Sequence, residues 1–160
     1  MSHFFNFLFS LVFVLFFQNS FSQLINIENK RLNAQEDGWS GNIDFNAKYT
    51  KNTKSVWQLS NKISIQYTKK KSTHLFLNDI SLVRSNQSDL VNSGFAHYRY
   101  TRPIASADFI KWESFAQIQY NSVQKIKQRT LLGSGLRFNI INTDSVYFTY
   151  GFALMYEYEE

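Results

Sequence analysis

Apolar and polar residues alternate one by one along most of the chain beyond residue 40. Ile43, Phe45, Ala47 and Tyr49 occupy odd positions, and the residues at the even positions between them are polar. A period of two is typical of a β-strand with one apolar and one polar face, whereas a helix needs a period of about 3.6. The pattern therefore predicts a strand rather than a helix.

The same alternation recurs along the rest of the chain, which predicts about seven strands in all. Short polar connections such as 52–54 and 142–144 separate the segments, and no long linker or low-complexity block divides them. This order is typical of an up-and-down meander of antiparallel hairpins. The predicted strand segments are 43–50, 57–67, 73–85, 91–101, 110–122, 127–141 and 145–159.

The third segment departs from a single parity. It begins with Leu75 and Leu77 at odd positions but continues with Ile80 and Leu82 at even positions. A β-bulge near Asn78-Asp79 would bring all four side chains to one face, because a bulge inserts one extra residue into a strand. We therefore predict a bulge there.

The predicted strands are long, and aromatic residues lie near their ends. Strands of soluble proteins are most often ~5–6 residues long, whereas these runs reach twice that, enough to cross a bilayer at a ~45° tilt. Trp57 and Tyr67 are ten residues apart, which gives an axial span of ~24 Å, close to the ~25 Å apolar band of outer-membrane barrels. The predicted aromatic girdle comprises Tyr49, Trp57, Tyr67, Tyr98, Tyr100, Trp112, Tyr120 and Tyr158.

These features predict an all-β fold, an antiparallel up-and-down transmembrane β-barrel. The alternative is a secreted soluble β-barrel or sandwich that binds an apolar ligand. Such a protein would have to accommodate the many Trp, Tyr and Phe side chains in its interior. Strand length and aromatic placement favour the membrane form.

The N-terminal residues resemble a secretory signal peptide. Residues 4–17 form an apolar stretch that is shorter than the ~20 residues of a membrane-spanning helix. Ser20-Phe21-Ser22 then supplies the small residues that a cleavage site requires. We predict a signal peptide at 1–22 with cleavage near Ser22, a periplasmic lead-in segment at 23–38 and a barrel domain at 39–160. An uncleaved N-terminal anchor helix is the alternative.

Composition narrows the chemistry. Lys and Arg number 17 against 12 Asp and Glu, aromatic residues make up 18%, and cysteine is absent. The absence of cysteine excludes disulfides, thiolate metal ligation and a cysteine nucleophile. The basic run at 69–71 lies at a predicted hairpin tip, so we expect no nucleic-acid partner, because such binding needs basic residues spread along a face. Attachment to anionic lipid phosphates at a membrane surface stays open.

The polar strand faces would line the barrel interior and carry both signs of charge. In a small barrel the interior is just wide enough for side chains, so Arg–Glu pairs that fill the lumen are one interpretation. The other is a selectivity lining or ligand pocket, in which arginine side chains bind an anionic solute. The predicted lumen network comprises His97, Arg99, Glu113, Arg129, Arg137 and Glu157.

No pattern in the chain predicts catalysis or a bound cofactor or metal. His97 has no serine or acid at a diagnostic spacing, and His74 has no partner histidine at metal-ligand spacing. Gly133-Ser134-Gly135 is too short for a phosphate-binding loop. Because nucleophilic catalysis needs a nucleophile, a base and an orienting group together, we predict that the protein is not an enzyme and has no cofactor.

Four stretches from Gly94 onward carry a family resemblance: GFAHYRYTRP, KWESFAQIQYNS, RTLLGSGLRFNI and YGFALMYEYEE. They resemble the DUF481 family, whose members are described as salt-induced outer-membrane proteins, and Trp39-Ser40-Gly41-Asn42 is similar to the start of that family's first barrel strand. The resemblance implies a β-barrel in the outer membrane of Gram-negative bacteria, in contact with outer-membrane lipid. Its role would be structural or related to envelope stress, and a small anion-selective pore or transporter is the alternative.

The resemblance and the strand count also predict an incomplete barrel. Members of the family continue beyond the strand that this chain ends with, and bacterial single-chain barrels have even numbers of strands. An open sheet edge in lipid leaves backbone groups unsatisfied. We therefore expect either a chain that is truncated at its C-terminus or closure by oligomerisation, and the sequence does not indicate the oligomeric state.

Overall fold

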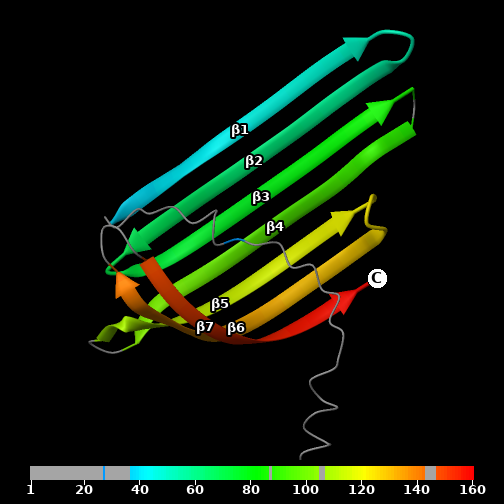
Figure 1. Cartoon of the computed structure of the whole chain (residues 1–160). Helices are drawn as coiled ribbons and strands as arrows, with labels where there is room; N and C mark the ends of the chain where they lie inside the picture. Colours follow the sequence, from blue (N-terminus) through cyan, green and yellow to red (C-terminus); the bar gives the residue numbers. More distant parts are fainter. Residues whose placement is uncertain (1–26, 28–36, 87, 105–106, 143–146) are drawn as a thin grey trace, which may run out of the picture.

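A computed structural model of the chain describes residues 27, 37–86, 88–104, 107–142 and 147–160, so the predicted signal peptide lies outside the described residues. These residues form one antiparallel sheet of seven strands in chain order, which confirms the predicted all-β meander (Figure 1). No helix among them is long and apolar enough to cross a membrane. The strands are β1 Gly38–Lys51, β2 Ser55–Lys69, β3 Ser72–Ser85, β4 Ser88–Ile104, β5 Ala107–Asn121, β6 Ile126–Asn142 and β7 Tyr147–Glu159.

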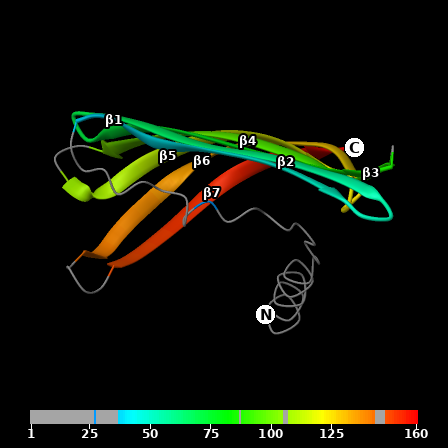
Figure 2. The same cartoon turned by 90° about the horizontal axis from the view of Figure 1, so that it is seen from above.

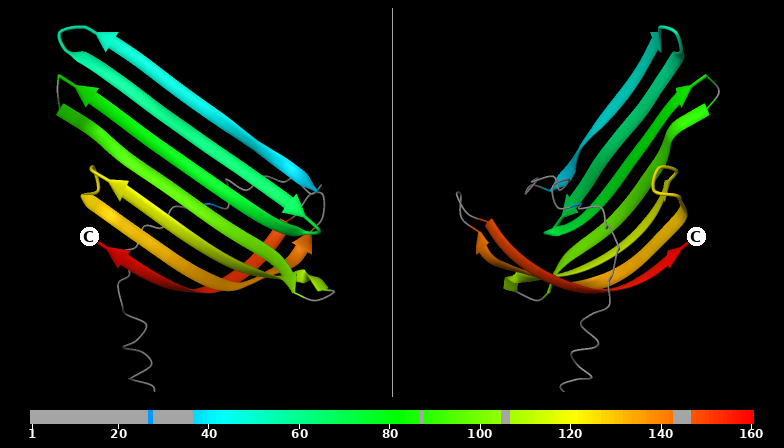
Figure 3. Two further views of the ribbon diagram at one scale, coloured as in Figure 1. Left: turned by 180° about the vertical axis from the view of Figure 1, so that it is seen from behind. Right: turned by 45° about the vertical axis from the view of Figure 1, so that its right-hand side comes forward.

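The sheet is curled but not closed. The order of paired strands runs from β1 to β7, so these two strands form the edges of the described sheet. Figures 2 and 3 show that the sheet bends into a trough, most strongly at β6 and β7. This open shape agrees with the predicted incomplete barrel.

The two faces of the sheet differ sharply in burial and polarity. Register pairs bring apolar residues together, as in Ile43↔Ile63 and Leu59↔Leu82, and this face is exposed, with Leu154 of β7 87% accessible. The opposite face holds the buried polar residues, and His97 there is only 1% accessible. Side chains converge on the concave side of a curled sheet, so we call the polar, buried face the inner face and the apolar, exposed face the outer face.

The bulge predicted near Asn78-Asp79 is wrong. β3 pairs with β2 without interruption from Ser72 to Ser85, and its only register shift against β4 lies between Val83 and Arg84. Residues at odd and even positions of β3 therefore keep to opposite faces throughout. The four apolar residues are divided between the faces, Leu75 and Leu77 on the inner one and Ile80 and Leu82 on the outer one.

Leu75 and Leu77 face inward because they belong to a small apolar cluster. They pack with Phe95 of β4 and with Ile27, and all four side chains are buried. Ile27 lies within the predicted lead-in segment, far from β3 in the sequence. An apolar patch on the inner face is stable here because a residue from outside the sheet covers it.

Two glycines leave room for aromatic rings of the neighbouring strand. A Cβ atom at Gly133 of β6 would lie 2.3 Å from the ring of Phe115, and one at Gly94 of β4 would lie 2.3 Å from the ring of Tyr120. Each glycine and its ring form a register pair, on the inner and outer face respectively. A ring packed across the neighbouring strand covers a glycine that has no side chain of its own.

Because the apolar side chains of β3 are divided between the two faces, shortening them to alanine should have unequal effects on the free energy of unfolding. Leu77→Ala should lower the free energy of unfolding by about 2 to 5 kcal/mol, because it opens a cavity between closely packed side chains. Ile80→Ala should cost a small part of that, because Ile80 lies on the outer face. Urea unfolding of the detergent-solubilised chain measures both, and equal losses would contradict the assigned faces.

Candidate functional site

Glu113 of β5 is the centre of an ionic cluster on the inner face. Its Oε2 lies 3.4 Å from Nη1 of Arg99 on β4, and its Oε1 lies 3.7 Å from Nη1 of Arg137 on β6. The hydroxyl of Thr101 donates to Oε1 at 3.2 Å. Glu113 pairs in register with Thr101 and Gly135. Arg99 precedes Thr101 by two residues and Arg137 follows Gly135 by two, so the two arginines lie on opposite diagonals of Glu113.

The Glu113 cluster is largely shielded from solvent. The side chains of Arg99, Glu113 and Arg137 are 11%, 14% and 9% accessible. The guanidinium of Arg99 lies 5.6 Å from the ring centroid of Phe115, and Arg137 donates from Nη2 to Oγ1 of Thr149 at 3.3 Å. Buried charges require such partners, because removing one of them leaves an uncompensated charge in a medium of low dielectric constant.

A second cluster surrounds Arg129 of β6. Its Nε lies 3.1 Å from Oε1 of Glu157 on β7, and its guanidinium also contacts the carboxylate of Glu159. Arg129 and Glu159 are register partners, and Glu157 lies diagonally across from Arg129. This cluster holds one arginine and two carboxylates, the reverse of the Glu113 cluster.

His97 of β4 is packed rather than exposed to a cavity. Its ring stacks between Phe95 and Phe115, with centroid distances of 6.0 and 5.8 Å. Its Nδ1 lies 3.1 Å from Oε1 of Gln117, whose Nε2 donates to Gln119 at 2.9 Å. The geometry fits a histidine that is packed into the inner face.

The structure thus places all six predicted lumen residues on the inner face but divides them. Arg99, Glu113 and Arg137 lie together, Arg129 and Glu157 form the second cluster, and His97 lies apart with glutamine partners. Sequence reasoning missed three further partners. They share the parity of the predicted set, which was the signal that could have identified them: Thr101, Thr149 and Glu159.

Aromatic rings form a continuous row across the outer face at the end of the sheet where β1 begins. Successive centroids are 4.8 Å apart for Trp39 and Tyr67, 6.3 Å for Tyr67 and His74, and 4.8 Å for His74 and Tyr100. Tyr100 then meets Trp112 edge to face at 5.9 Å. We call this row the aromatic belt, and it extends from β1 to β5.

The eight residues of the predicted girdle lie on the outer face, four toward each end of the strands. Tyr67, Tyr98, Tyr100 and Trp112 lie toward the end where β1 begins. At the opposite end, the rings of Tyr49 and Trp57 are 4.5 Å apart. The remaining two residues there are Tyr120 on β5 and Tyr158 on β7.

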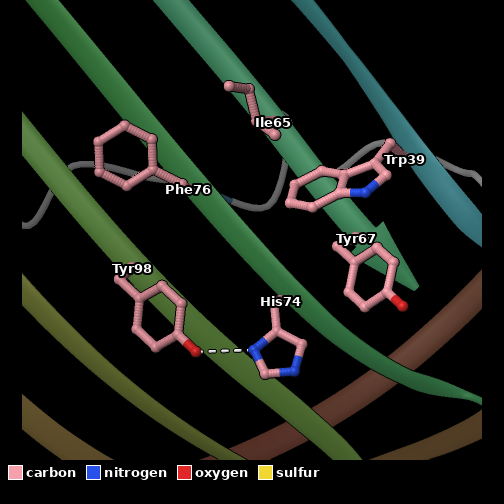
Figure 4. A pocket seen from close by; sticks show the side chains of 6 residues that line it. All are labelled: Trp39, Ile65, Tyr67, His74, Phe76 and Tyr98. Carbon is pink, nitrogen blue, oxygen red and sulfur yellow. Dashed lines mark hydrogen bonds between the residues drawn. The ribbon is translucent and has the colours of Figure 1, made fainter. Parts of the chain in front are cut away.

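Beside the aromatic belt the outer face is hollowed into a groove of about 330 Å³ that is lined almost entirely by apolar atoms. Figure 4 shows that His74 points toward Tyr98 across the floor of this groove, and His74 Nδ1 and the Tyr98 hydroxyl are 2.7 Å apart. We call it the aromatic groove. Its lining residues come from β1 to β4 and are Trp39, Ile65, Tyr67, His74, Phe76 and Tyr98.

The part of the chain that the structure describes contains no candidate metal site. No group of three or more His, Cys, Asp or Glu residues there could hold a metal ion. That the protein is not an enzyme and binds no cofactor remains a prediction.

Comparison with known proteins identifies a family. A family model described as a protein of unknown function, DUF481, matches residues 19–160 of the chain. No curated protein and no solved structure matches the chain.

The Glu113 cluster predicts a stability effect. Glu113→Gln should lower the free energy of unfolding by about 3 kcal/mol or more, because it leaves two arginines without their shared carboxylate in a buried site. The matched control is Glu160→Gln, which breaks an exposed ion pair with Lys127 and should cost no more than about 1 kcal/mol. Urea unfolding in detergent compares the two, and equal stability of both variants would contradict a stabilising role for the cluster.

Proposed function

The chain belongs to the DUF481 family, whose function is unknown, and we propose that it forms the wall of a β-barrel in the outer membrane of a Gram-negative bacterium. One observation carries this proposal. The sheet has an apolar outer face that is exposed to solvent and a polar inner face with buried ion pairs. Soluble proteins have the reverse arrangement, whereas outer-membrane barrels have a lipid-facing apolar band around a polar interior.

The exposed apolar surface is also extensive. Trp39 and Phe45 of β1 are largely exposed, as are Phe152 and Leu154 of β7 at the other edge. Soluble monomers rarely expose contiguous apolar patches of more than a few hundred Å². Lipid chains would solvate such a surface without cost, so the surface supports a membrane location.

Strand length and aromatic placement give independent support. The seven strands have 13 to 17 residues, whereas crossing a bilayer at a ~45° tilt requires ~9–11. Aromatic residues near both ends of the strands correspond to the two girdles that mark the membrane–water interfaces of outer-membrane barrels.

The inner face favours a structural role over an anion-selective pore. Its two ionic clusters contain three arginines and three glutamates, so their formal charges cancel. Each arginine already contacts a carboxylate that would compete with a passing anion. Neutral, ion-paired clusters of this kind are the arrangement expected for a small barrel whose side chains occupy the lumen.

Export is part of this proposal. A signal peptide at 1–22 would deliver the chain across the inner membrane, and the segment 23–38 would then lie in the periplasm. The end of the sheet where β1 begins would face the periplasm as well. The aromatic belt and the β2–β3 hairpin would lie at the inner leaflet.

Membrane fractionation tests the location. The protein in its native host should be recovered with outer membranes and should change its mobility in SDS gels after heating, because a barrel resists SDS until it is heated. Recovery in the soluble periplasmic fraction, with no change of mobility on heating, would overturn the proposal and favour a soluble β-protein.

Conductance separates a structural wall from a pore. The purified protein in planar lipid bilayers should give no discrete channel events, because the arginines of both ionic clusters are already held by carboxylates. Reproducible anion-selective steps would contradict the structural role and support the pore. Loss of these steps in an Arg137→Gln variant would then locate the pore lining at the Glu113 cluster.

A further inference from the structure

The aromatic groove is a concave, apolar site on a surface that would otherwise meet lipid as a smooth wall. Its volume of about 330 Å³ falls within the ~300–1,000 Å³ of small-molecule pockets. Ile65 and Phe76 line it on the side of the sheet centre, and Tyr67 and His74 line it toward the strand ends (Figure 4). A slender apolar chain that enters from the sheet centre would therefore end beside the β2–β3 hairpin.

That hairpin carries Lys69, Lys70 and Lys71, all of which are exposed. Lys69 lies two residues beyond Tyr67 on the same strand and face, about 7 Å from the rim of the groove. Arg102 of β4 is also exposed and lies two residues beyond Tyr100 of the aromatic belt. Positive charge therefore borders the groove on the side where the strands end.

Among the described residues, the carboxylate of Asp37 contacts this hairpin. Oδ1 of Asp37 accepts a hydrogen bond from the backbone N–H of Lys70 at 3.0 Å. This contact fixes the position of the hairpin backbone relative to the start of β1. Among the residues that the structure describes, Lys69, Lys70 and Arg102 outnumber this aspartate at the rim of the groove.

The backbone of the hairpin indicates that the lysines are there for more than turn formation. Lys70 and Lys71 have positive φ angles of 47° and 67°. Two successive residues with positive φ are typical of a type I′ hairpin turn, which strongly prefers Asn-Gly. Lysine is strained in this conformation, and retained strain at a surface turn suggests a function for the side chains.

We propose that the aromatic groove and the β2–β3 hairpin together bind one anionic phospholipid, with an acyl chain in the groove and the headgroup phosphate against Lys69 and Lys70. Charge complementarity selects this occupant, because a zwitterionic lipid would gain much less from the cationic rim. The inference rests on the proposed function, since the outer face meets lipid only if the sheet lies in a membrane.

Two of the three tryptophans of the chain allow a site-specific test. Trp39 lines the aromatic groove, and Trp57 lies on the outer face at the opposite end of the strands; both are exposed. The full chain with Trp57→Phe and Trp112→Phe reports on the groove, and the form with Trp39→Phe and Trp112→Phe is its control. Each is reconstituted into phosphatidylcholine vesicles that contain a minor fraction of brominated phosphatidylglycerol or brominated phosphatidylcholine.

The proposal predicts that brominated phosphatidylglycerol quenches Trp39 fluorescence severalfold more than brominated phosphatidylcholine does. The two lipids should quench Trp57 equally. Lys70→Asn with Lys71→Gly should lower the difference at Trp39 by about fivefold, because the variant removes Lys70 and a lysine near an anionic phosphate contributes about that factor in affinity. This variant has the favoured type I′ sequence and should fold at least as well as the parent.

Matched variants separate the site from general surface charge. Lys51→Gln with Lys54→Gln neutralises the hairpin at the other end of the sheet and should leave the preference at Trp39 intact. Tyr98→Ser removes one wall of the groove and should reduce the preference severalfold. A preference that survives Tyr98→Ser would overturn the role of the groove.

The outcomes also distinguish this site from the proposed function. Equal quenching of Trp39 by both brominated lipids, with Trp57 quenched as well, would overturn the phospholipid site but leave the membrane location in place. Absence of quenching at both tryptophans by either lipid would overturn the membrane location itself, and the lipid site with it.

Discussion

The constant parity of the strands is the constraint on which the rest of the structure depends. Side chains alternate between faces, so a slip of one residue in any pairing would move charged residues to the apolar face. The register shifts near Arg84, Ile104, Asn121 and Ile141 all lie close to strand ends. The central part of each strand therefore keeps its faces, and both ionic clusters form across uninterrupted pairing.

The sequence was sufficient to predict the strands and their polar and apolar faces, because both follow from a local period of two. It failed at β3, where Leu75 and Leu77 point inward against Ile27, since a contact with a residue almost fifty positions earlier has no local signal. The ion pairs show the same limit. Parity placed Arg99 and Glu113 on one face, but only the register between β4 and β5 makes them partners.

Two polar residues on the outer face are compatible with lipid because the sheet itself supplies their hydrogen-bond partners. Asn78 donates from Nδ2 to the backbone carbonyl of Phe95 at 3.2 Å. Ser134 accepts from the indole N–H of Trp112 at 2.7 Å and donates to the carbonyl of Glu113 at 3.3 Å. Such internal partners matter in a bilayer, where no water replaces a missing hydrogen bond. The hydrogen bond from Trp112 to Ser134 also orients Trp112 at the end of the aromatic belt.

The stability of this sheet and its proposed location are linked by one argument. A single curled sheet has no second layer to cover its apolar face. The buried apolar cluster on its inner face is small and consists of Leu75, Leu77, Phe95 and Ile27. Hydrophobic burial within the described residues therefore supplies little of the stabilising free energy that a soluble domain needs. Lipid on the outer face would replace the missing core, while the ladders and the ion pairs hold the polar face together. The sheet is thus suited to fold where its surroundings are apolar, and a barrel wall in a membrane meets that condition.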